Sequence, residues 1–355
     1  MTPLSRFEQF SALFPNEKLF RWKQLSHAFF DPVVKNWQGV TVLPKPMREE
    51  LAKQIPWVSY RDSKVFSSAN EDTYKAILTL ADKKQVETVL MANKRDQWTI
   101  CVSSQVGCAM KCAFCATGKM GLIRSLSADE IMDQYRFWRA FLNEGAIGES
   151  RLQGARISNV VFMGMGEPLA NYEAVKTTLK TWLSNTDLGP THITVSTVGV
   201  LPILEKLLSD PEWPAVRMAI SLHSADPKTR HELVPSSHDL FIPQLKKWAK
   251  KYLKNLGNRR HHLTFEYVML QNVNDTDHHA ETLTNLVRSL GQIKVNLIPY
   301  NFTDSEFQRS ADDRIERFKT FLETHGVDVM VRRTMGDDIA AACGQLITKE
   351  GSGRV

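Results

Sequence analysis

The stretch that decides the fold is CVSSQVGCAMKCAFCATGKMG, residues 101–121, which holds four of the chain's five cysteines. Three of them, Cys108, Cys112 and Cys115, follow the spacing C-x3-C-x2-C, and Cys101 lies just upstream. The fifth, Cys343, is far away in the sequence. Three closely spaced thiols are one ligand short of a closed zinc site or of a fully protein-ligated iron–sulfur cube. The spacing therefore indicates a metal centre with an open coordination position.

Two kinds of metal centre fit this spacing. One is a four-cysteine zinc site that recruits Cys101, and the other is a four-iron cluster on the three clustered cysteines, with one iron left for a substrate or cofactor. The motif directly follows an apolar strand pattern, has Phe114 just before its third cysteine, and stands at the head of a long series of strands and helices. This setting favours the open cluster over a small zinc knuckle.

Size and composition are those of a globular protein. A chain of 355 residues is long for one domain and short for three, so we expect one large domain and one small domain. No uninterrupted apolar run approaches the ~20 residues needed to cross a bilayer. The N-terminal segment MTPLSRFEQFSALF has no pattern of a secretory signal. We therefore expect a soluble, cytoplasmic protein whose cysteines stay reduced.

The net charge of +6 is compatible with a polyanionic partner but does not demand one. The densest basic stretch is LKKWAKKYLKNLGNRR, a predicted amphipathic helix with lysines on one side and apolar residues on the other. Its lysines are Lys246, Lys247, Lys250, Lys251 and Lys254. Taken alone, this pattern is typical of a solvated helix face, and the alternative is contact with nucleic-acid phosphates.

The chain divides into four predicted parts. Residues 1–70 read as a small helical accessory domain, for example at PNEKLFRWKQLSHAFF. Residues 71–96 read as a β-hairpin extension, because TYKAILTLA and QVETVLM flank the turn-like DKK. Residues 97–346 form the core, and 347–355 a polar tail.

Beyond Gly118 the core alternates apolar β-branched runs with helical stretches such as SADEIMDQYRFWRAFLNE, which Ser127 and Glu130 would open with a capping box. This alternation predicts an α/β fold with about six parallel strands, either an open sheet or a partial barrel, and a site at the strands' C-terminal ends. The predicted strands after the cysteine motif are ISNVVFMGM, HITVSTVGV, VRMAISLHS, HLTFEYVML, IKVNLIPYN and VDVMVRR.

The three-cysteine motif resembles that of radical S-adenosylmethionine (SAM) enzymes, and a longer series of segments resembles the RlmN/Cfr family of RNA adenine methyltransferases. The segments follow the family's order between Glu87 and Leu346. They are VETV, CVSSQVGC, CAFCATG, MGMGEPLAN, STVG, ISLH, EYVML, VNLIPYN and GDDIAAACGQL. The resemblance implies a partial (βα)6 radical-SAM barrel and an N-terminal helical domain that binds RNA.

The resemblance also implies a cofactor site. Cys108, Cys112 and Cys115 would hold a [4Fe–4S] cluster whose free iron is chelated by SAM. Without the resemblance, the turn at Gly166 is as readily a simple bend, and His223 is more readily a structural histidine. The positions that match SAM-contacting residues of the family are Gly166, Glu167, Ser196, Ser221, Leu222, His223 and Asn301.

The implied reaction gives roles to the remaining cysteines. Carbons C2 and C8 of adenine are electron-poor, so direct polar attack on the SAM methyl group has no electron pair to use, and a radical route is needed. In the family two SAM molecules are used per turnover. The resemblance makes Cys343 the carrier of the methyl group as S-methylcysteine, Cys101 the residue that resolves the adduct through a transient disulfide, and Glu87 the proton acceptor. Without it, both cysteines would read as small buried hydrophobes and Glu87 as solvated.

The implied substrate is 23S ribosomal RNA, at an adenine of the peptidyl-transferase centre. GEPL, NLIPYN and RRTMGDDI resemble the C2 branch, whereas YNFTDSEFQRS and LVPSSHDL depart from it and leave open whether tRNA is a second substrate. The implied partners are RNA and an electron donor such as a flavodoxin or ferredoxin, with no membrane. The alternatives are an adenine-C8 methyltransferase, a divergent member acting on another RNA, and, outside enzymes, a zinc-stabilised RNA-binding protein.

Overall fold

The structure, a computed structural model, describes residues 4–144, 152, 155–256, 263–291 and 293–347. The polar tail expected at 347–355 lies outside these ranges except for its first residue. None of the helices within the described ranges is long and apolar enough to span a membrane.

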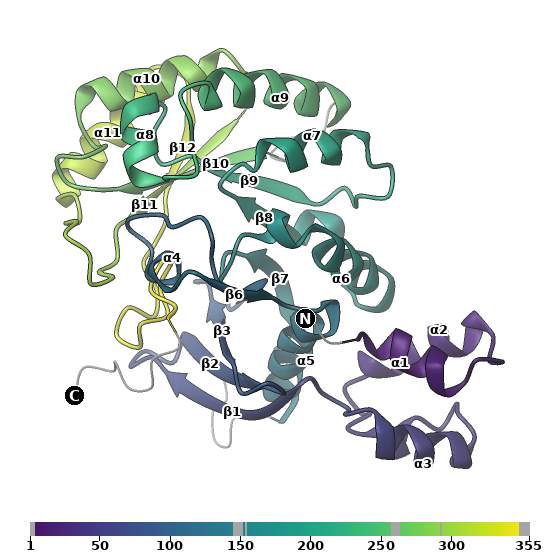
Figure 1. Cartoon of the computed structure of the whole chain (residues 1–355). Coiled ribbons are helices and arrows are strands. Elements are labelled where there is room, and N and C mark those ends of the chain that lie inside the picture. Colours follow the sequence, from purple (N-terminus) through teal and green to yellow (C-terminus); the bar gives the residue numbers. More distant parts are fainter. Residues whose placement is uncertain (1–3, 145–151, 153–154, 257–262, 292, 348–355) are drawn as a thin grey trace.

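Three short helices at the N-terminus form a small body beside the rest of the chain, purple in Figure 1. Helix α1 begins with a capping box, because the Glu8 N–H donates to Ser5 Oγ at 3.2 Å and the Ser5 N–H donates to the Glu8 carboxylate at 2.7 Å. Leu25, Trp37 and Leu51 are buried between these helices. The elements are α1 (Arg6–Leu13), α2 (Leu19–Phe29), the 3-10 turn η1 (Trp37–Gly39) and α3 (Lys45–Gln54).

An antiparallel ribbon connects this body to the barrel, which is the core of parallel strands between residues 98 and 331. It consists of β1 (Tyr60–Ser67), β2 (Thr73–Leu80) and β3 (Gln85–Ala92), and β3 pairs with β4 (Trp98–Cys101). The expectation of helical structure up to residue 70 is therefore wrong at β1. This edge strand is exposed or half-buried along its whole length, so its sequence lacks the apolar alternation that marks a strand.

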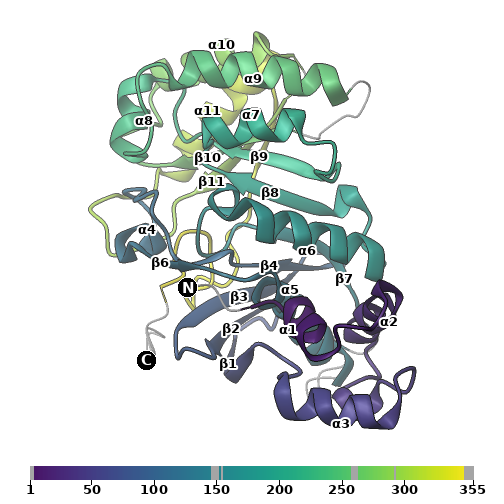
Figure 2. The same cartoon turned by 45° about the vertical axis from the view of Figure 1, so that its right-hand side comes forward.

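The core is a sheet of parallel strands with helices packed outside it (Figures 1 and 2). Across the described residues, the sheet order is β1-β2-β3-β4-β7-β8-β9-β10-β11-β12, parallel from β4 onward. The predicted α/β fold with a central parallel sheet is confirmed, and β12 adds one strand beyond six βα units. The parallel strands after β4 are β7 (Ile157–Phe162), β8 (Ile193–Thr197), β9 (Arg217–Ser221), β10 (Leu263–Met269), β11 (Lys294–Pro299) and β12 (Asp328–Val331).

Each crossover between neighbouring parallel strands contains at least one helix. Helix α5 begins with the predicted capping box, in which the Ser127 N–H donates to the Glu130 carboxylate at 2.8 Å and the Glu130 N–H donates to Ser127 Oγ at 3.2 Å. The helices are α5 (Ala128–Glu144), α6 (Tyr172–Asn185), α7 (Leu201–Ser209), α8 (Pro227–Leu233), α9 (Phe241–Leu256), α10 (Asp277–Arg288) and α11 (Asp312–Thr324). Two 3-10 turns accompany them, η2 (Pro168–Asn171) and η3 (Pro190–His192).

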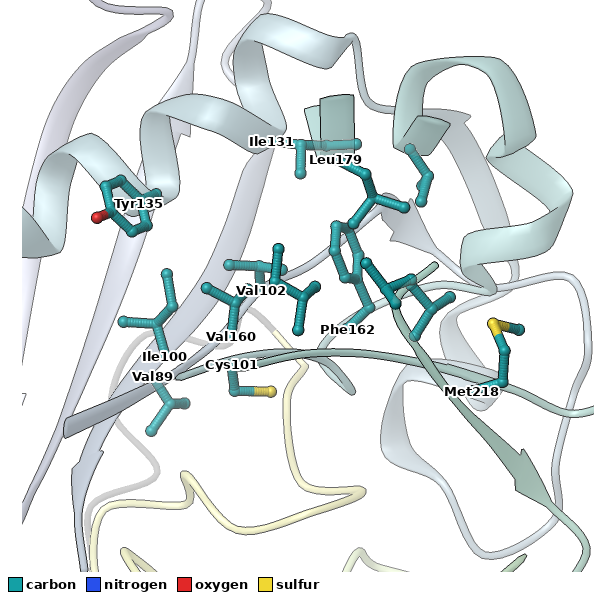
Figure 3. Close-up of a cluster of buried hydrophobic side chains, with 14 of the residues drawn as sticks. Val89, Ile100, Cys101, Val102, Ile131, Tyr135, Val160, Phe162, Leu179 and Met218 are labelled. Atoms are coloured by element: carbon teal, nitrogen blue, oxygen red, sulfur yellow. The ribbon is translucent and has the colours of Figure 1, made fainter. Parts of the chain in front are cut away.

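The main hydrophobic core lies between the sheet and these helices. Figure 3 shows Tyr135 of α5 and Leu179 of α6 on the same side of the sheet as the strand residues Ile100, Val160 and Phe162. All five side chains are buried. Because this face of the sheet is filled by apolar packing, polar residues that could form a site are left to the strand ends and to the opposite face.

Candidate active site

The three-cysteine loop runs from a short hairpin strand to a short helix. The elements are β5 (Gln105–Gly107), α4 (Ala116–Met120) and β6 (Leu122–Ser125). The Cys108 N–H donates to Gly121 O at 3.0 Å, and the Cys115 N–H donates to Cys112 O at 3.1 Å. A Cβ on Gly118 would lie 3.0 Å from both the backbone N and O of Cys112, so glycine is needed for this close approach.

All three thiols of this loop line one pocket. The wall around Cys112 is apolar and includes Val268 and Tyr300. Burial raises the pKa of each thiol, that of Cys108 to about 11, and repulsion from the Cys115 thiolate adds to the rise at Cys108 and Cys112. A metal centre must therefore displace protons from these thiols when it binds.

The arrangement of sulfurs distinguishes the two metal centres that the spacing left open. No group of three His, Cys, Asp or Glu side chains within the described ranges could hold a single metal ion. Cys101, the fourth ligand of the zinc alternative, lines a different pocket from the three clustered cysteines. A tetrahedral zinc site needs every sulfur about 2.3 Å from one centre. Three thiols around one pocket instead fit a cluster in which each sulfur binds its own iron.

The turn after β7 brings a carboxylate to the same pocket. Gly166 has a φ of +99° and contacts Gln105 so closely that an added Cβ would lie 2.5 Å from that residue's Cβ. The Glu167 carboxylate accepts the N–H groups of Leu169 and Val198, each at 2.9 Å. Burial raises the pKa of Glu167, and these hydrogen bonds oppose the rise. The carboxylate is therefore held in a fixed orientation at the pocket wall.

The ends of β8 and β9 contribute the next residues. Ser196 and Ser221 both line the pocket, and their hydroxyl oxygens are 3.1 Å apart. His223 also lines it, with Nδ1 accepting the Val268 N–H at 3.2 Å. Burial lowers the pKa of His223 to about 3, so the ring is neutral near pH 7. Leu222 differs from the other expected cofactor contacts, because its side chain is fully buried in the core and does not line the pocket.

The C-terminal loop, the yellow segment beside α4 in Figure 1, contributes Cys343 and Gly344 to the pocket lining. Asn301 Nδ2 donates to Cys343 O at 3.2 Å, and Asn301 itself lines the pocket. The Ala116 N–H donates to Gly344 O at 2.8 Å, so this loop is bound directly to the start of α4. Gln345 Nε2 donates to Phe302 O at 3.1 Å, so the loop is also bound to the segment that follows β11.

Cys101 and Cys343 meet in a second pocket. Cys343 is exposed and lines both pockets, whereas Cys101 is buried at the end of β4 and lines only the second. In Figure 3 the Cys101 sulfur points away from the packed core and toward the yellow C-terminal segment. Burial raises the pKa of Cys101 to about 12, the Cys343 thiolate adds to the rise, and Arg332 opposes it. The fold therefore brings together two thiols that are far apart in sequence.

Glu87 lies in β3 and is buried, not solvated. Its carboxylate forms an ion pair with Lys75 Nζ at 3.2 Å and accepts the Ile347 N–H at 3.0 Å. These contacts attach it to the segment just after Cys343, although its side chain lines neither of the two pockets described above. The Glu87 C=O also accepts the Ser103 Oγ–H, so segments outside the ribbon pack against this residue, which a hairpin pattern alone does not reveal.

Three charged residues at these pockets, Glu266, Arg332 and Arg333, have no role predicted from the sequence. Glu266 of β10 is buried and lines the first pocket, and Arg332 after β12 lines the second. Arg332 Nη1 is 3.5 Å from the Glu266 carboxylate. The sequence does mark Glu266 as a candidate functional residue, because it is a charged residue inside the apolar run LTFEYVML. Charges are rarely buried without a partner.

The basic helix α9 is amphipathic as predicted. Leu245, Trp248 and Ala249 are buried, while most of its lysines are exposed. Lys251 forms a salt bridge with Glu205 at 3.1 Å. Figures 1 and 2 both show α9 on the outer surface of the barrel, apart from the C-terminal loop.

This chain is similar to several known proteins in sequence and in structure. The sequence profile of the Radical SAM superfamily matches residues 102–283. The dual-specificity RNA methyltransferase RlmN of Alcanivorax borkumensis is 38% identical over 93% of this chain and 85% of its own length. A probable dual-specificity RNA methyltransferase RlmN of Prochlorococcus marinus is 39% identical over 93% of this chain and 89% of its own. The crystal structure of a radical SAM methyltransferase from Sphaerobacter thermophilus has a TM-score of 0.85 and 37% identity, covering 97% of both chains.

Proposed function

The chain belongs to the RlmN family of the radical SAM superfamily, and from this membership we propose that it methylates an adenine ring carbon, C2, in RNA. The proposed substrate is 23S ribosomal RNA at the peptidyl-transferase centre, with tRNA as the second substrate. The names of the relatives, dual-specificity RNA methyltransferases, support two substrates. One observation carries the proposal most directly: Cys343 lines both the pocket of the three clustered cysteines and the pocket of Cys101.

Family membership implies a [4Fe–4S] cluster and SAM. Cys108, Cys112 and Cys115 would hold the cluster, which supplies the electron that cleaves SAM to a 5′-deoxyadenosyl radical. The walls of the same pocket would hold SAM. Its proposed contacts are Gly166, Glu167, Ser196, Ser221, His223 and Asn301, all of which line the pocket, together with the backbone at Leu222.

Cys343 is the proposed methyl carrier. A thiolate is a competent nucleophile, so its sulfur takes the methyl group from a first SAM molecule and S-adenosylhomocysteine leaves. A second SAM molecule is used in the same turnover, after the S-methyl group is in place. The hydrogen bond from Asn301 Nδ2 to Cys343 O would hold the carrier loop at the pocket during both steps.

Cys101 is the proposed resolving residue. After the methylene group has joined the base to Cys343, attack by the Cys101 thiolate on the Cys343 sulfur forms a disulfide and breaks the carbon–sulfur bond. The electron pair of that bond remains with the methylene carbon, which takes up a proton and becomes the methyl group of the base. Because burial raises the pKa of Cys101 to about 12, this thiol is protonated in the resting protein near pH 7. A hydrogen bond from the Met163 backbone and the charge of Arg332 both favour the thiolate.

Glu87 is the proposed acceptor of the ring proton. Its carboxylate binds the Ile347 N–H, so it is attached to the segment that carries Cys343. The ion pair with Lys75 supports an ionised carboxylate, which is the form that can accept a proton. Proton transfer on this route requires the segment around Ile347 to shift, because the side chain does not line the cysteine pockets.

RNA binding is proposed for residues 1–70 and for the lysine face of 246–254. We keep residues 71–96 as the extension that carries Glu87 and residues 97–346 as the catalytic core, with a polar tail from 347. A flavodoxin or ferredoxin in the cytoplasm is the proposed electron donor. The alternative of a zinc-stabilised RNA-binding protein is disfavoured, because Cys101 is grouped with Cys343 and not with the clustered cysteines.

Nucleoside mass spectrometry tests this proposal. The anaerobically reconstituted protein is incubated with SAM, a reductant and either a 23S rRNA fragment or tRNA, and the digested nucleosides are analysed. We expect 2-methyladenosine from both RNAs. 8-Methyladenosine would instead identify a C8 enzyme, and a reconstituted protein that cleaves SAM without methylating either RNA would contradict the proposed substrates.

A further inference from the structure

Arg230 of α8 is a buried charged residue whose hydrogen-bond partners Ser221 and Val198 line the cysteine pocket. Its side chain is 1% exposed. Nη1 donates to Ser221 O at 3.0 Å and also to Leu222 O, and Nη2 donates to Val198 O at 2.6 Å. The guanidinium stacks on the Phe241 ring, 4.0 Å from its centroid. These contacts fix its position at the ends of β8 and β9.

This guanidinium has no anionic partner of its own. Within the described ranges, no acidic side chain lies within ion-pair distance of it, and its Nε has no hydrogen-bond partner. The nearby Glu167 carboxylate is bound instead to the backbone N–H groups of Leu169 and Val198. Burial lowers the pKa of Arg230 to about 9, so the side chain is still charged near pH 7. A buried charge without a counter-charge is costly, so this position favours an anion close to the guanidinium.

The nearest candidate for that anion is the cysteine loop. The Ala113 N–H donates to Leu233 O at 2.9 Å, which ties the loop to the last turn of α8. Cys112 packs against Leu233 and Val234 in one small hydrophobic cluster. The Val234 N–H donates to Arg230 O at 2.8 Å, so a residue of this cluster lies one helical turn from Arg230. The positive charge of Arg230 therefore acts on the Cys112 side of the pocket.

We propose that Arg230 is the buried counter-charge of the cluster at its ligand Cys112, and that this charge makes the cluster easier to reduce. The inference rests on the proposed cluster ligands, and it goes beyond them by naming a residue that sets the reduction potential. Each electron added to a thiolate-ligated cluster increases its negative charge. A fixed positive charge in a low-dielectric wall therefore stabilises the reduced form more than the oxidised form.

Two substitutions at Arg230 separate its charge from its hydrogen bonds. Arg230→Gln keeps N–H donors and removes the charge, whereas Arg230→Lys keeps the charge and loses most of the hydrogen bonds. The reconstituted full-length variants are titrated with dithionite and mediator dyes, and the reduced cluster is measured by electron paramagnetic resonance. We expect Arg230→Gln to lower the ratio of reduced to oxidised cluster about tenfold at a fixed potential, which is 59 mV for a one-electron couple. Arg230→Lys should stay close to the wild type.

A matched control and a second pair of variants complete the test. Arg217→Gln removes an arginine from the first residue of β9, at the opposite end of the strand from Ser221, and should leave the potential unchanged. Phe241→Glu places a carboxylate beside the guanidinium, and Phe241→Gln is its uncharged counterpart. The first should lower the potential relative to the second. This pair decides the question if Arg230→Gln fails to hold the cluster, because it leaves Arg230 and its hydrogen bonds in place.

The outcomes distinguish this inference from the function on which it rests. If Arg230→Gln has the wild-type potential, the charge has no effect and the inference is overturned. If Arg230→Lys shifts the potential as far as Arg230→Gln does, the hydrogen bonds and not the charge set the potential, and the inference is overturned as well. Equal potentials for Phe241→Glu and Phe241→Gln overturn it as well. A wild-type chain that binds no iron under reconstitution would contradict the proposed function itself, and with it the role of Arg230.

Discussion

Asp133 joins the N-terminal helices to the barrel, and its replacement by Asn is expected to be severely destabilising. This residue of α5 is fully buried and forms ion pairs with Arg6 of α1 and with Arg136. It also accepts the Ser59 N–H at 2.6 Å. Asp133→Asn preserves the shape of the side chain but removes the charge that both guanidinium groups share.

The magnitude follows from the two arginines left behind. Removing one partner of a buried ion pair typically costs about 3–5 kcal/mol, because the remaining charge is buried without compensation. That is a large part of the roughly 5–15 kcal/mol by which a domain is stable. Arg6 keeps a second partner, since its Nη1 is 3.3 Å from Asp129, which places the expected loss at the lower end, about 3 kcal/mol.

The contribution of Asp133 to the free energy of unfolding depends on pH, and the direction of this dependence follows from its pKa. Burial alone would raise the pKa of Asp133, but the charges of Arg6 and Arg136 and the hydrogen bonds from Arg6 and Ser59 lower it to about 2. A folded-state pKa below the unfolded value of about 3.9 means that the unfolded chain binds the proton more readily. The contribution of Asp133 is therefore fully present above about pH 4 and is lost as the pH falls toward about 2.

Urea unfolding, followed by tryptophan fluorescence, measures the loss. We expect Asp133→Asn to lower the free energy of unfolding by about 3 kcal/mol at pH 7, and the difference from the wild type to shrink as the pH approaches 2. The control is Glu212→Gln, which breaks the exposed ion pair with Lys180 and should leave the urea midpoint nearly unchanged. If Asp133→Asn is no more destabilising than Glu212→Gln, the buried network does not hold the accessory helices to the barrel.

Three further sets of substitutions test the cysteine loop and the lysine face. Cys112→Ala should abolish the cluster, seen as loss of bound iron and of the broad visible absorbance after reconstitution, and an iron-replete active variant would refute the ligand assignment. Gly118→Ala places a Cβ 3.0 Å from the backbone N and O of Cys112, so it should lower the iron content at unchanged overall secondary structure, and full iron loading would contradict this. Alanine substitutions on the lysine face of 246–254 should reduce the slope of log affinity for RNA against log salt by roughly 0.7 to 0.9 per lysine. An unchanged slope would leave that face as a solvated helix surface.

The sequence predicted the parallel core well because most residues of its strands are buried or half-buried. Such strands appear as runs rich in β-branched residues, such as ITVST at β8, which differ clearly from the flanking amphipathic helices. Strand β1 was missed for the opposite reason. Its residues face solvent at a sheet edge and are mostly charged or polar, as in the segment YRDSKVFS, so no apolar alternation marks it.

The site was predictable only where local spacing carries the chemistry. Three thiols within eight residues indicate an open metal centre on their own. The proximity of Cys101 and Cys343 depends on how β4 and the C-terminal loop pack, which no local pattern contains, so the resemblance to a family was required. Arg230 had no signal at all, since an arginine in the polar helix PKTRHEL is normally solvated and only its tertiary contacts reveal its burial.

The measurement that tests the central claim most directly is the fate of RNA on two cysteine variants. Cys343→Ala should lose both the protein-bound methyl group and the methylated RNA. Cys101→Ala should still load the methyl group and add it to RNA, but it should trap the RNA on the protein as a covalent adduct. A gel assay for protein-linked RNA, followed by nuclease digestion and peptide mass spectrometry, should locate the bridge at Cys343. No adduct with Cys101→Ala, or an adduct attached at any other residue, would contradict the division of roles between the two cysteines.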